Sequence, residues 1–223
     1  MASVLSVAQS FEAFIGRRAP ARDPEVDILA ELFESAGGGA SSAQVARRLL
    51  DETGSLAGAL AATVADLARL GVPQEARRAL AALRAAVTAS LKRSVEDRPC
   101  LASGRALIDY LHADMAFAPV ERFRVLFLNN KNVLIRDEVM SEGSLQAAPV
   151  FTREIVKRAL DHGAAALILV HNHTSGDPAP SRDDIEVTRE IVAAAGLFGI
   201  AVHDHIIVGR QGHASLGQLG YLG

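Results

Sequence analysis

Hydrophobic residues in the first 97 positions recur at the spacing of helices, and no stretch alternates as a strand does. Gly37, Gly38 and Gly39 interrupt this pattern, so several short helices are expected. The predicted helices are 27–33, a helix from Ser42 as N-cap to Leu50, a short helix with a capping box at Thr63 and Asp66, and a longer helix from near Pro73 with Leu80, Leu83, Val87 and Leu91 on one face. We therefore expect a small all-α domain over residues 1–97.

From residue 98 onward the pattern is that of strands mixed with helices. The change falls at Asp97, Arg98 and Pro99, because the residue before a proline is driven out of helical geometry. The expected elements are a helix over 103–112, a hairpin of strands 122–128 and 133–139 around the turn 129–132, a helix over 152–160, a strand over 164–170 buried on both faces, a helix over 182–195, and short strands over 200–202 and 205–208. Residues 98–223 are thus predicted to form an α/β domain, a mixed sheet flanked by helices.

Composition and charge narrow the class of protein. The chain has 223 residues, 49% hydrophobic and 22% charged, which is typical of a folded protein. No apolar run approaches the ~20 residues of a membrane span, and the first residues lack the pattern of a secretory signal, so we expect a cytoplasmic protein with no membrane contact. The formal net charge of −3 gives no overall attraction for nucleic acid. Cys100 is the single cysteine, which excludes a thiolate-rich zinc site.

The residues that carry chemistry follow the apolar strand. Residues two apart on a strand point to the same side, so His171 and His173 bring two imidazoles together. Asp184 lies eleven residues further on, beyond a loop whose glycine and prolines suit a sharp return. Two histidines and one carboxylate leave the fourth position of a tetrahedral zinc ion to water, which is the arrangement of a catalytic site. Such a water can be deprotonated near neutral pH and attack a carbonyl.

Structural explanations exist for parts of this pattern. Ser181 and Asp184 also have the spacing of a capping box that starts a helix. A second His-x-His surrounds Asp204, and we expect this segment to support the metal ligands by hydrogen bonds, with Asp204 on the opposite face of the sheet from the two histidines. Ser175 and Asp177 are expected to orient the loop between the ligands. Cys100 is expected to be a small buried residue without chemistry.

The motif resembles two related families. His171-x-His173, seven further residues, Ser181, two more and Asp184 resemble the signature of the JAMM (MPN-plus) metalloprotease domain. The stretch 167–178 resembles the bacterial RadC family more closely, and this resemblance extends over roughly residues 100–223. It includes Arg153-Glu154, residues 204–209 and the closing 220–222. The resemblance implies a cytidine-deaminase-like JAMM/MPN core over 98–223 and a hydrolase that cleaves a peptide or isopeptide bond.

Roles follow from the resemblance by position. It implies that His171, His173 and Asp184 bind Zn²⁺ and that Ser181 helps to stabilise the oxyanion of a tetrahedral intermediate. The general base of the family is a glutamate at the start of the first strand of the domain, and Glu121 occupies the similar position here. The nearby carboxylates that compete with Glu121 for this role are Asp137, Glu138 and Glu142.

The chain also departs from the family. Typical members have a proline where this chain has Thr174 and a His-Pro pair where it has Phe151-Thr152. The helical part resembles a degenerate helix-hairpin-helix element, whose Pro-Gly-x-Gly turn is reduced here to residues 70–74 with one glycine. Residues 1–97 carry 11 Lys and Arg against 12 Asp and Glu, which weakens the case for DNA contact. The alternative function is a DNA-associated repair or recombination protein, which binds DNA weakly through 1–97 and has a structural or vestigial metal site.

Overall fold

The chain contains two compact units. The computed structural model describes residues 23–96, 99–100, 104–143 and 151–222. Of these, 23–59 and 63–79 form the first unit, and 60–62 and 80–222 form the second. One helix, α6 (Gln74–Glu96), runs from the first unit into the second. Residues 97 and 98, where the sequence predicts the domain boundary, lie outside the described residues, so a division of the chain there stays a prediction. The first residues, in which no secretory signal was expected, also lie outside the described residues.

The first unit is helical, as the sequence predicts. Its α2 begins where the Asp23 carboxylate accepts a hydrogen bond from the main-chain N–H of Glu25, and α3 ends at Gly54, whose φ of 76° suits a helix C-terminus. Thr63 caps α5 through its hydroxyl, as expected. The elements are α2 (Pro24–Ser35), a 3₁₀ turn η1 (Gly39–Ser41), α3 (Ser42–Thr53), α4 (Leu56–Ala61) and α5 (Val64–Arg69).

Two details of this unit differ from the expectation. Ser42 is not the N-cap of α3 but its first residue, because η1 leads directly into the helix and the Ser42 hydroxyl donates to the Gly39 carbonyl. The short helix α4 was not predicted, since its six residues are too few to display a helical period.

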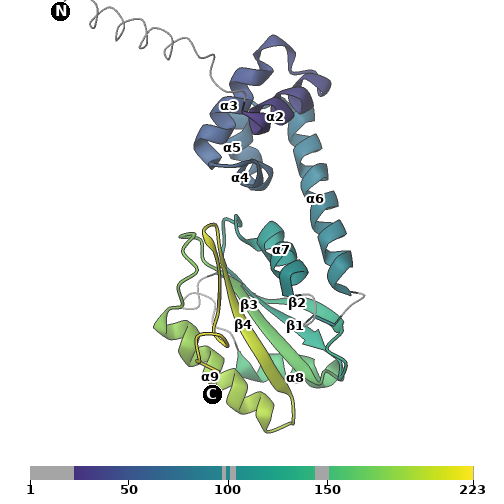
Figure 1. Cartoon of the computed structure of the whole chain (residues 1–223), viewed down its shortest axis with the longest axis vertical. Helices are drawn as coiled ribbons and strands as arrows, with labels where there is room; N and C mark the ends of the chain where they lie inside the picture. Colours follow the sequence, from purple (N-terminus) through teal and green to yellow (C-terminus); the bar gives the residue numbers. More distant parts are fainter. Residues whose placement is uncertain (1–22, 97–98, 101–103, 144–150, 223) are drawn as a thin grey trace, which may run out of the picture. The chain divides into compact units, whose positions relative to one another are not determined.

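The second unit is a five-stranded mixed sheet with helices on both faces (Figure 1). The strand order is β2-β1-β3-β4-β5, in which β3 and β4 are parallel and the other neighbours are antiparallel. The elements after α6 are α7 (Gly104–Met115), β1 (Arg122–Leu128), β2 (Leu134–Glu142), α8 (Thr152–Asp161), β3 (Ala166–Asn172), α9 (Arg182–Gly196), β4 (Ala201–Gly209) and β5 (Gly212–Ser215). The predicted mixed α/β class and the β1–β2 hairpin are confirmed.

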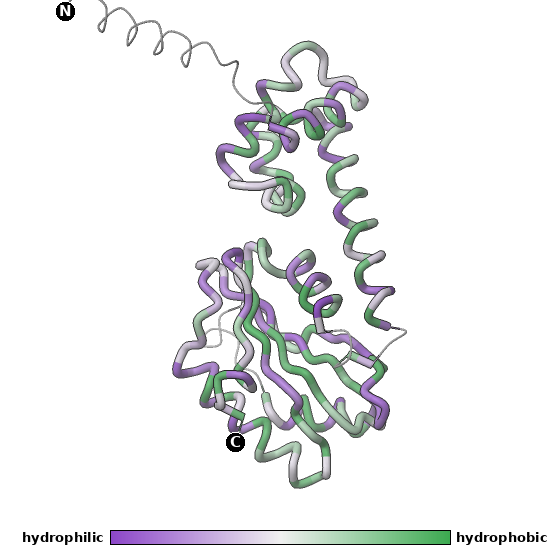
Figure 2. The backbone as a smooth tube through the Cα atoms, in the orientation of Figure 1, coloured by the Kyte–Doolittle hydropathy of each residue, from purple (hydrophilic) through white to green (hydrophobic). Residues whose placement is uncertain are grey.

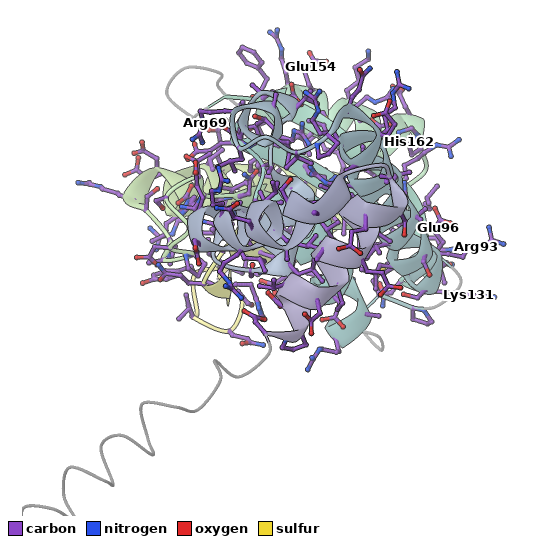
Figure 3. All side chains as sticks on the ribbon, turned by 90° about the horizontal axis from the view of Figure 1, so that it is seen from above. Arg69, Arg93, Glu96, Lys131, Glu154 and His162 are labelled. Carbon is purple, nitrogen blue, oxygen red and sulfur yellow. The ribbon has the colours of Figure 1, made fainter. Side chains whose placement is uncertain are left out.

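Burial of the central strand organises the two layers of core. All seven residues of β3 are buried, and hydrophobic colour runs along the inner strands in Figure 2. The strand begins and ends two residues later than the predicted 164–170, so it includes the polar His171 and Asn172. Ile168 and Val170 pack toward α7, whereas Leu167 and Leu169 pack toward α8 and α9. The turn after β1 is polar, its Asn130 and Lys131 are exposed, and Lys131 projects outward (Figure 3). Among the described residues, no helix combines the length and apolar character that crossing a bilayer requires.

The end of the sheet differs from the prediction. The two short strands expected over 200–202 and 205–208 are one continuous strand, β4, whose pairing with β3 shifts register at His203. The polar residues His203 and Asp204 interrupt the apolar pattern and produced the error, whereas the backbone simply forms a bulge there. The edge strand β5 was not predicted, because its four residues contain two small and two polar side chains.

Candidate metal centre

Two histidines converge at the end of β3. His171 is the penultimate residue of the strand, and His173 follows it with its main-chain N–H donating to the Val208 carbonyl of β4. Their Nε2 atoms lie 2.9 Å apart. The His171 ring is buried and stacks on Phe123 of β1, with ring centroids 6.2 Å apart and planes inclined by 13°. The two-residue period of an extended chain therefore brings these rings together, as predicted.

Asp184 completes the cluster from the first turn of α9. Its carboxylate is 2% exposed, with Oδ1 3.0 Å from Nε2 of His171 and Oδ2 3.3 Å from Nε2 of His173. The predicted capping box is present as well, because Oδ2 accepts from the main-chain N–H of Ser181 at 2.7 Å and the Ser181 Oγ accepts from that of Asp184 at 3.2 Å. The capping and metal-binding interpretations are thus compatible, since the cap fixes the carboxylate that faces the histidines.

The loop between the ligands fixes the orientation of His173. Its Nδ1 lies 2.9 Å from the carbonyl oxygen of Asp177. A carbonyl only accepts, so Nδ1 carries the proton and the neutral ring presents its Nε2 lone pair to the cluster. Ser175 and Asp177 shape this loop as expected, because their side chains accept from the N–H groups of Asp177 and Ala179.

A buried hydrogen-bond chain fixes the orientation of His171. The Thr188 hydroxyl donates its one proton to the main-chain carbonyl of Asp184, so its oxygen accepts from Nδ1–H of His205. Complete burial lowers the pKa of His205 well below its usual value, and the neighbouring His171 lowers it further. The neutral His205 therefore accepts at Nε2 from Nδ1–H of His171, 2.8 Å away. His171, like His173, is left with a lone pair at Nε2.

Three electron-pair donors therefore face one point, and this donor set fits zinc. Burial opposes ionisation of Asp184, but the two adjacent imidazoles, which donate to the carboxylate when they are protonated, outweigh it and hold the pKa of the carboxyl well below its usual range. The contact with Asp184 likewise raises the pKa of His173 against the effect of burial. Both pKa shifts indicate that a positive charge between the Asp184 carboxylate and the imidazoles is stabilised. About 3.3 Å separates two ligand atoms of a tetrahedral zinc site with bonds of about 2.0 Å, close to the spacings observed here.

Glu121 lies beside the cluster, immediately before β1. Its half-buried carboxylate accepts from the Thr174 hydroxyl at 3.5 Å, and its charge contributes to the raised pKa of His173. Glu121 lies two residues before Phe123, whose ring stacks on His171. In an extended chain, side chains two residues apart point to the same face.

The competing carboxylates have other partners. Asp137 accepts from Tyr110 and pairs with Arg124 on the α7 side of the sheet. Glu138 pairs with Arg158 and His162, and Glu142 pairs with Arg122. Because these bonds direct the three carboxylates to other groups, Glu121 remains the prediction for the general base.

The second His-x-His does not form a rival cluster. His203 Nε2 contacts Asn132 Oδ1 at 2.8 Å, whereas His205 contacts His171. Val202 and His205 both face the α8–α9 layer, although they are three residues apart. The bulge between them breaks the alternation of side chains along the strand. The expected position of Asp204 relied on that alternation. The supporting role expected for the segment is therefore carried by His205.

Two further residues, Thr188 beside the cluster and Cys100 at the far end of β1, had different outcomes. Sequence reasoning missed Thr188, although its position one helical turn after Asp184 was a usable signal. Cys100 is buried as expected, and burial raises the pKa of its thiol.

Comparison with known proteins agrees with this geometry. A family model described as the RadC-like JAB domain matches residues 101–221. A relative described as a UPF0758 protein, from Rhodobacter capsulatus, is 48% identical over 167 residues, which cover 74% of this chain and 78% of the relative. Since the domain match spans more than half of the chain and the relative shares nearly half of the aligned residues, the chain belongs to the RadC family, whose members carry the RadC-like JAB domain.

Proposed function

We propose that this chain is a zinc-dependent hydrolase that cleaves a peptide or isopeptide bond. The observation that carries the proposal is the convergence of the Nε2 lone pairs of His171 and His173 with the carboxylate of Asp184. Other groups hold the remote nitrogen of each ring, so protons are directed away from the cluster. Ligating histidines depend on such outer contacts to fix their tautomer.

The residues around the cluster have chemically distinct tasks. His171, His173 and Asp184 would hold zinc, which when bound supplies a Lewis acid that polarises a carbonyl and acidifies water. Glu121 would accept the proton of the attacking water and deliver it to the leaving amine, since its carboxylate lies beside the cluster without an arginine or lysine partner among the described contacts. Ser181 is exposed and uses a lone pair for its capping bond, so its O–H is available to stabilise an oxyanion.

Metal content separates the ligands from the general base. The wild-type protein should bind zinc in equimolar amount by atomic absorption, and His173→Ala and Asp184→Ala should lose it. Glu121→Gln should retain zinc, because Glu121 is not a ligand. If both ligand variants retain equimolar zinc, the ligand assignment is wrong.

Hydrolysis can be detected without knowing the natural substrate. Zinc-loaded protein is incubated in ¹⁸O-enriched water with a peptide library and with proteins joined through lysine side chains. Each bond cleaved by water places one heavy oxygen in a new carboxyl group, which mass spectrometry detects. Glu121→Gln should lower this rate by about 10² to 10⁴-fold. Glu142→Gln is the matched control, because that carboxylate pairs with Arg122, and it should change the rate little. Absence of labelled carboxyl groups from both substrate classes contradicts the proposal.

The DNA-binding alternative receives no support from the helical unit. In the turn that resembles a helix-hairpin-helix element, the N–H groups of Gly71 and Val72 donate to the carbonyls of Ala68 and Leu67. These amides therefore close the preceding helix rather than face outward toward a phosphate. Salt-dependent DNA binding that survives removal of zinc would favour the alternative.

A further inference from the structure

The residue between the two histidines has an unusual set of contacts. Asn172 is fully buried, and the alternation of the strand turns its side chain away from the side on which His171 and His173 meet. Its Oδ1 accepts from the main-chain N–H of Arg122 at 2.9 Å, and its Nδ2 donates to the carbonyl of Val120 at 3.2 Å. One side chain thus bonds the main chain on both sides of Glu121.

These bonds replace a part of the sheet that is missing. The pairing of β1 with β3 ends at Phe123 opposite His171, whereas Arg122 still pairs with Glu142 of β2. Asn172 spans the gap that opens there. On the other side, the Glu121 carbonyl accepts from the N–H of Gly143 at 2.8 Å, just after β2. The Glu121 backbone is therefore held from both flanks, by a side chain of β3 and by the main chain that follows β2.

We infer that Asn172 is a positioning residue for hydrolysis: it holds the backbone on both sides of Glu121 and so aims that carboxylate at the metal cluster. This inference rests on the proposed function, in which Glu121 is the general base. Asn172 lies between the two histidine ligands, so the strand that places the ligands also places the base relative to them. The N–H and carbonyl that it bonds are backbone groups, which leaves the Glu121 side chain free for chemistry.

Two variants and a control test the inference. Asn172→Ala removes both bonds, whereas Asn172→Asp retains the acceptor for Arg122 N–H and can donate to Val120 only when its carboxyl is protonated. The aspartate is nearly isosteric and leaves no cavity, so it provides a second variant if the alanine destabilises the protein. The matched control is Asn129→Ala at the other end of β1, because Asn129 also bonds backbone, accepting from the N–H groups of Lys131 and Val133.

The first measurement is amide hydrogen exchange by NMR on the zinc-loaded full chain, with zinc content determined in parallel. Asn172→Ala should accelerate exchange of the Arg122 amide at least tenfold and leave zinc equimolar, while the Asp184 amide, bonded to Ser181, remains protected. Asn172→Asp should leave Arg122 protected. Unchanged exchange of Arg122 in Asn172→Ala overturns the inference, and this result does not depend on any enzymatic activity.

The second measurement is turnover of a substrate found by the heavy-oxygen assay. Because a displacement of about 1 Å can cost about 100-fold in rate, Asn172→Ala should lower kcat by about that factor with little change in KM. On the Glu121→Gln background the same substitution should have no further effect, since its target is already gone. Independent, multiplicative losses would show a merely structural role and overturn the inference. If the wild type shows no turnover, the proposed function fails, and the Arg122 exchange rate still decides whether Asn172 holds this segment.

Discussion

The strongest test of the site lies outside the three proposed ligands, at His205. Replacing His205 with leucine removes the acceptor for Nδ1–H of His171 and the donor to Thr188 in one step. The residue is fully buried, so water cannot take over the acceptor role at ordinary cost. In the variant, His171 gains by moving its proton to Nε2, where it can donate to the ionised Asp184. Zinc binding then has to reverse that tautomer.

The expected loss of zinc affinity in this variant follows from the contact between His171 and His205 that it removes. Outer partners of metal-bound histidines change metal affinity by about 10- to 100-fold, or about 1.4 to 2.8 kcal/mol. The upper part of this range applies, because the 2.8 Å contact between His171 and His205 lies in a fully buried environment. Thr188 keeps its bond to the Asp184 carbonyl in the variant, so α9 should remain in place.

Competition with a chromophoric zinc chelator measures this affinity directly. His203→Leu is the matched control, since it removes the other histidine of the same strand, whose contact is with Asn132. We expect the His205 variant to lose at least tenfold in zinc affinity and the His203 variant to lose less than twofold. Equal losses in both variants, or no loss at His205, would refute the hydrogen-bond chain as the support of His171.

Three further predictions concern the surroundings of the site. Tyr110→Phe removes a 2.6 Å hydrogen bond to the buried Asp137 and should lower the free energy of unfolding, measured in urea, by about 2 kcal/mol without changing zinc content. Gly209→Ala places a Cβ 2.3 Å from the Gly176 carbonyl and should push out the loop that holds His173, lowering zinc affinity in the chelator assay, whereas Gly196→Ala, with open space around it, should not. In metal-free protein the raised pKa of His173 contributes stability that is present below about pH 6.5 and is lost as pH rises through the folded value. The lowered pKa of Asp184 contributes stability that is present above about pH 4 and is lost progressively as pH falls below that value. Urea unfolding in chelator should therefore show lower stability at about pH 9 than at about pH 6, and Asp184→Asn should remove most of that difference.

Much of the fold was predictable because its signals are local. The apolar run of β3 predicted a strand buried on both faces, and the capping box at Ser181 and Asp184 predicted the start of α9. Errors arose where tertiary contacts override the local pattern. His203 and Asp204 look like a break between two strands, but pairing with β3 carries the backbone through a bulge. Ser42 has the character of an N-cap, but the preceding 3₁₀ turn takes that place.

The candidate ligand set followed from the sequence alone, since a two-residue strand period and a helix-start motif each place side chains within one element. The residues that hold these side chains in place could not be found from local sequence patterns. His171 meets His205 across 34 positions, and Asn172 meets Arg122 across 50, because the sheet order puts β3 between β1 and β4. The sequence thus determined which groups can bind a metal. Only the tertiary structure decided which nitrogen each ring presents and where the carboxylate of Glu121 is held, since both depend on hydrogen bonds between strands far apart along the chain.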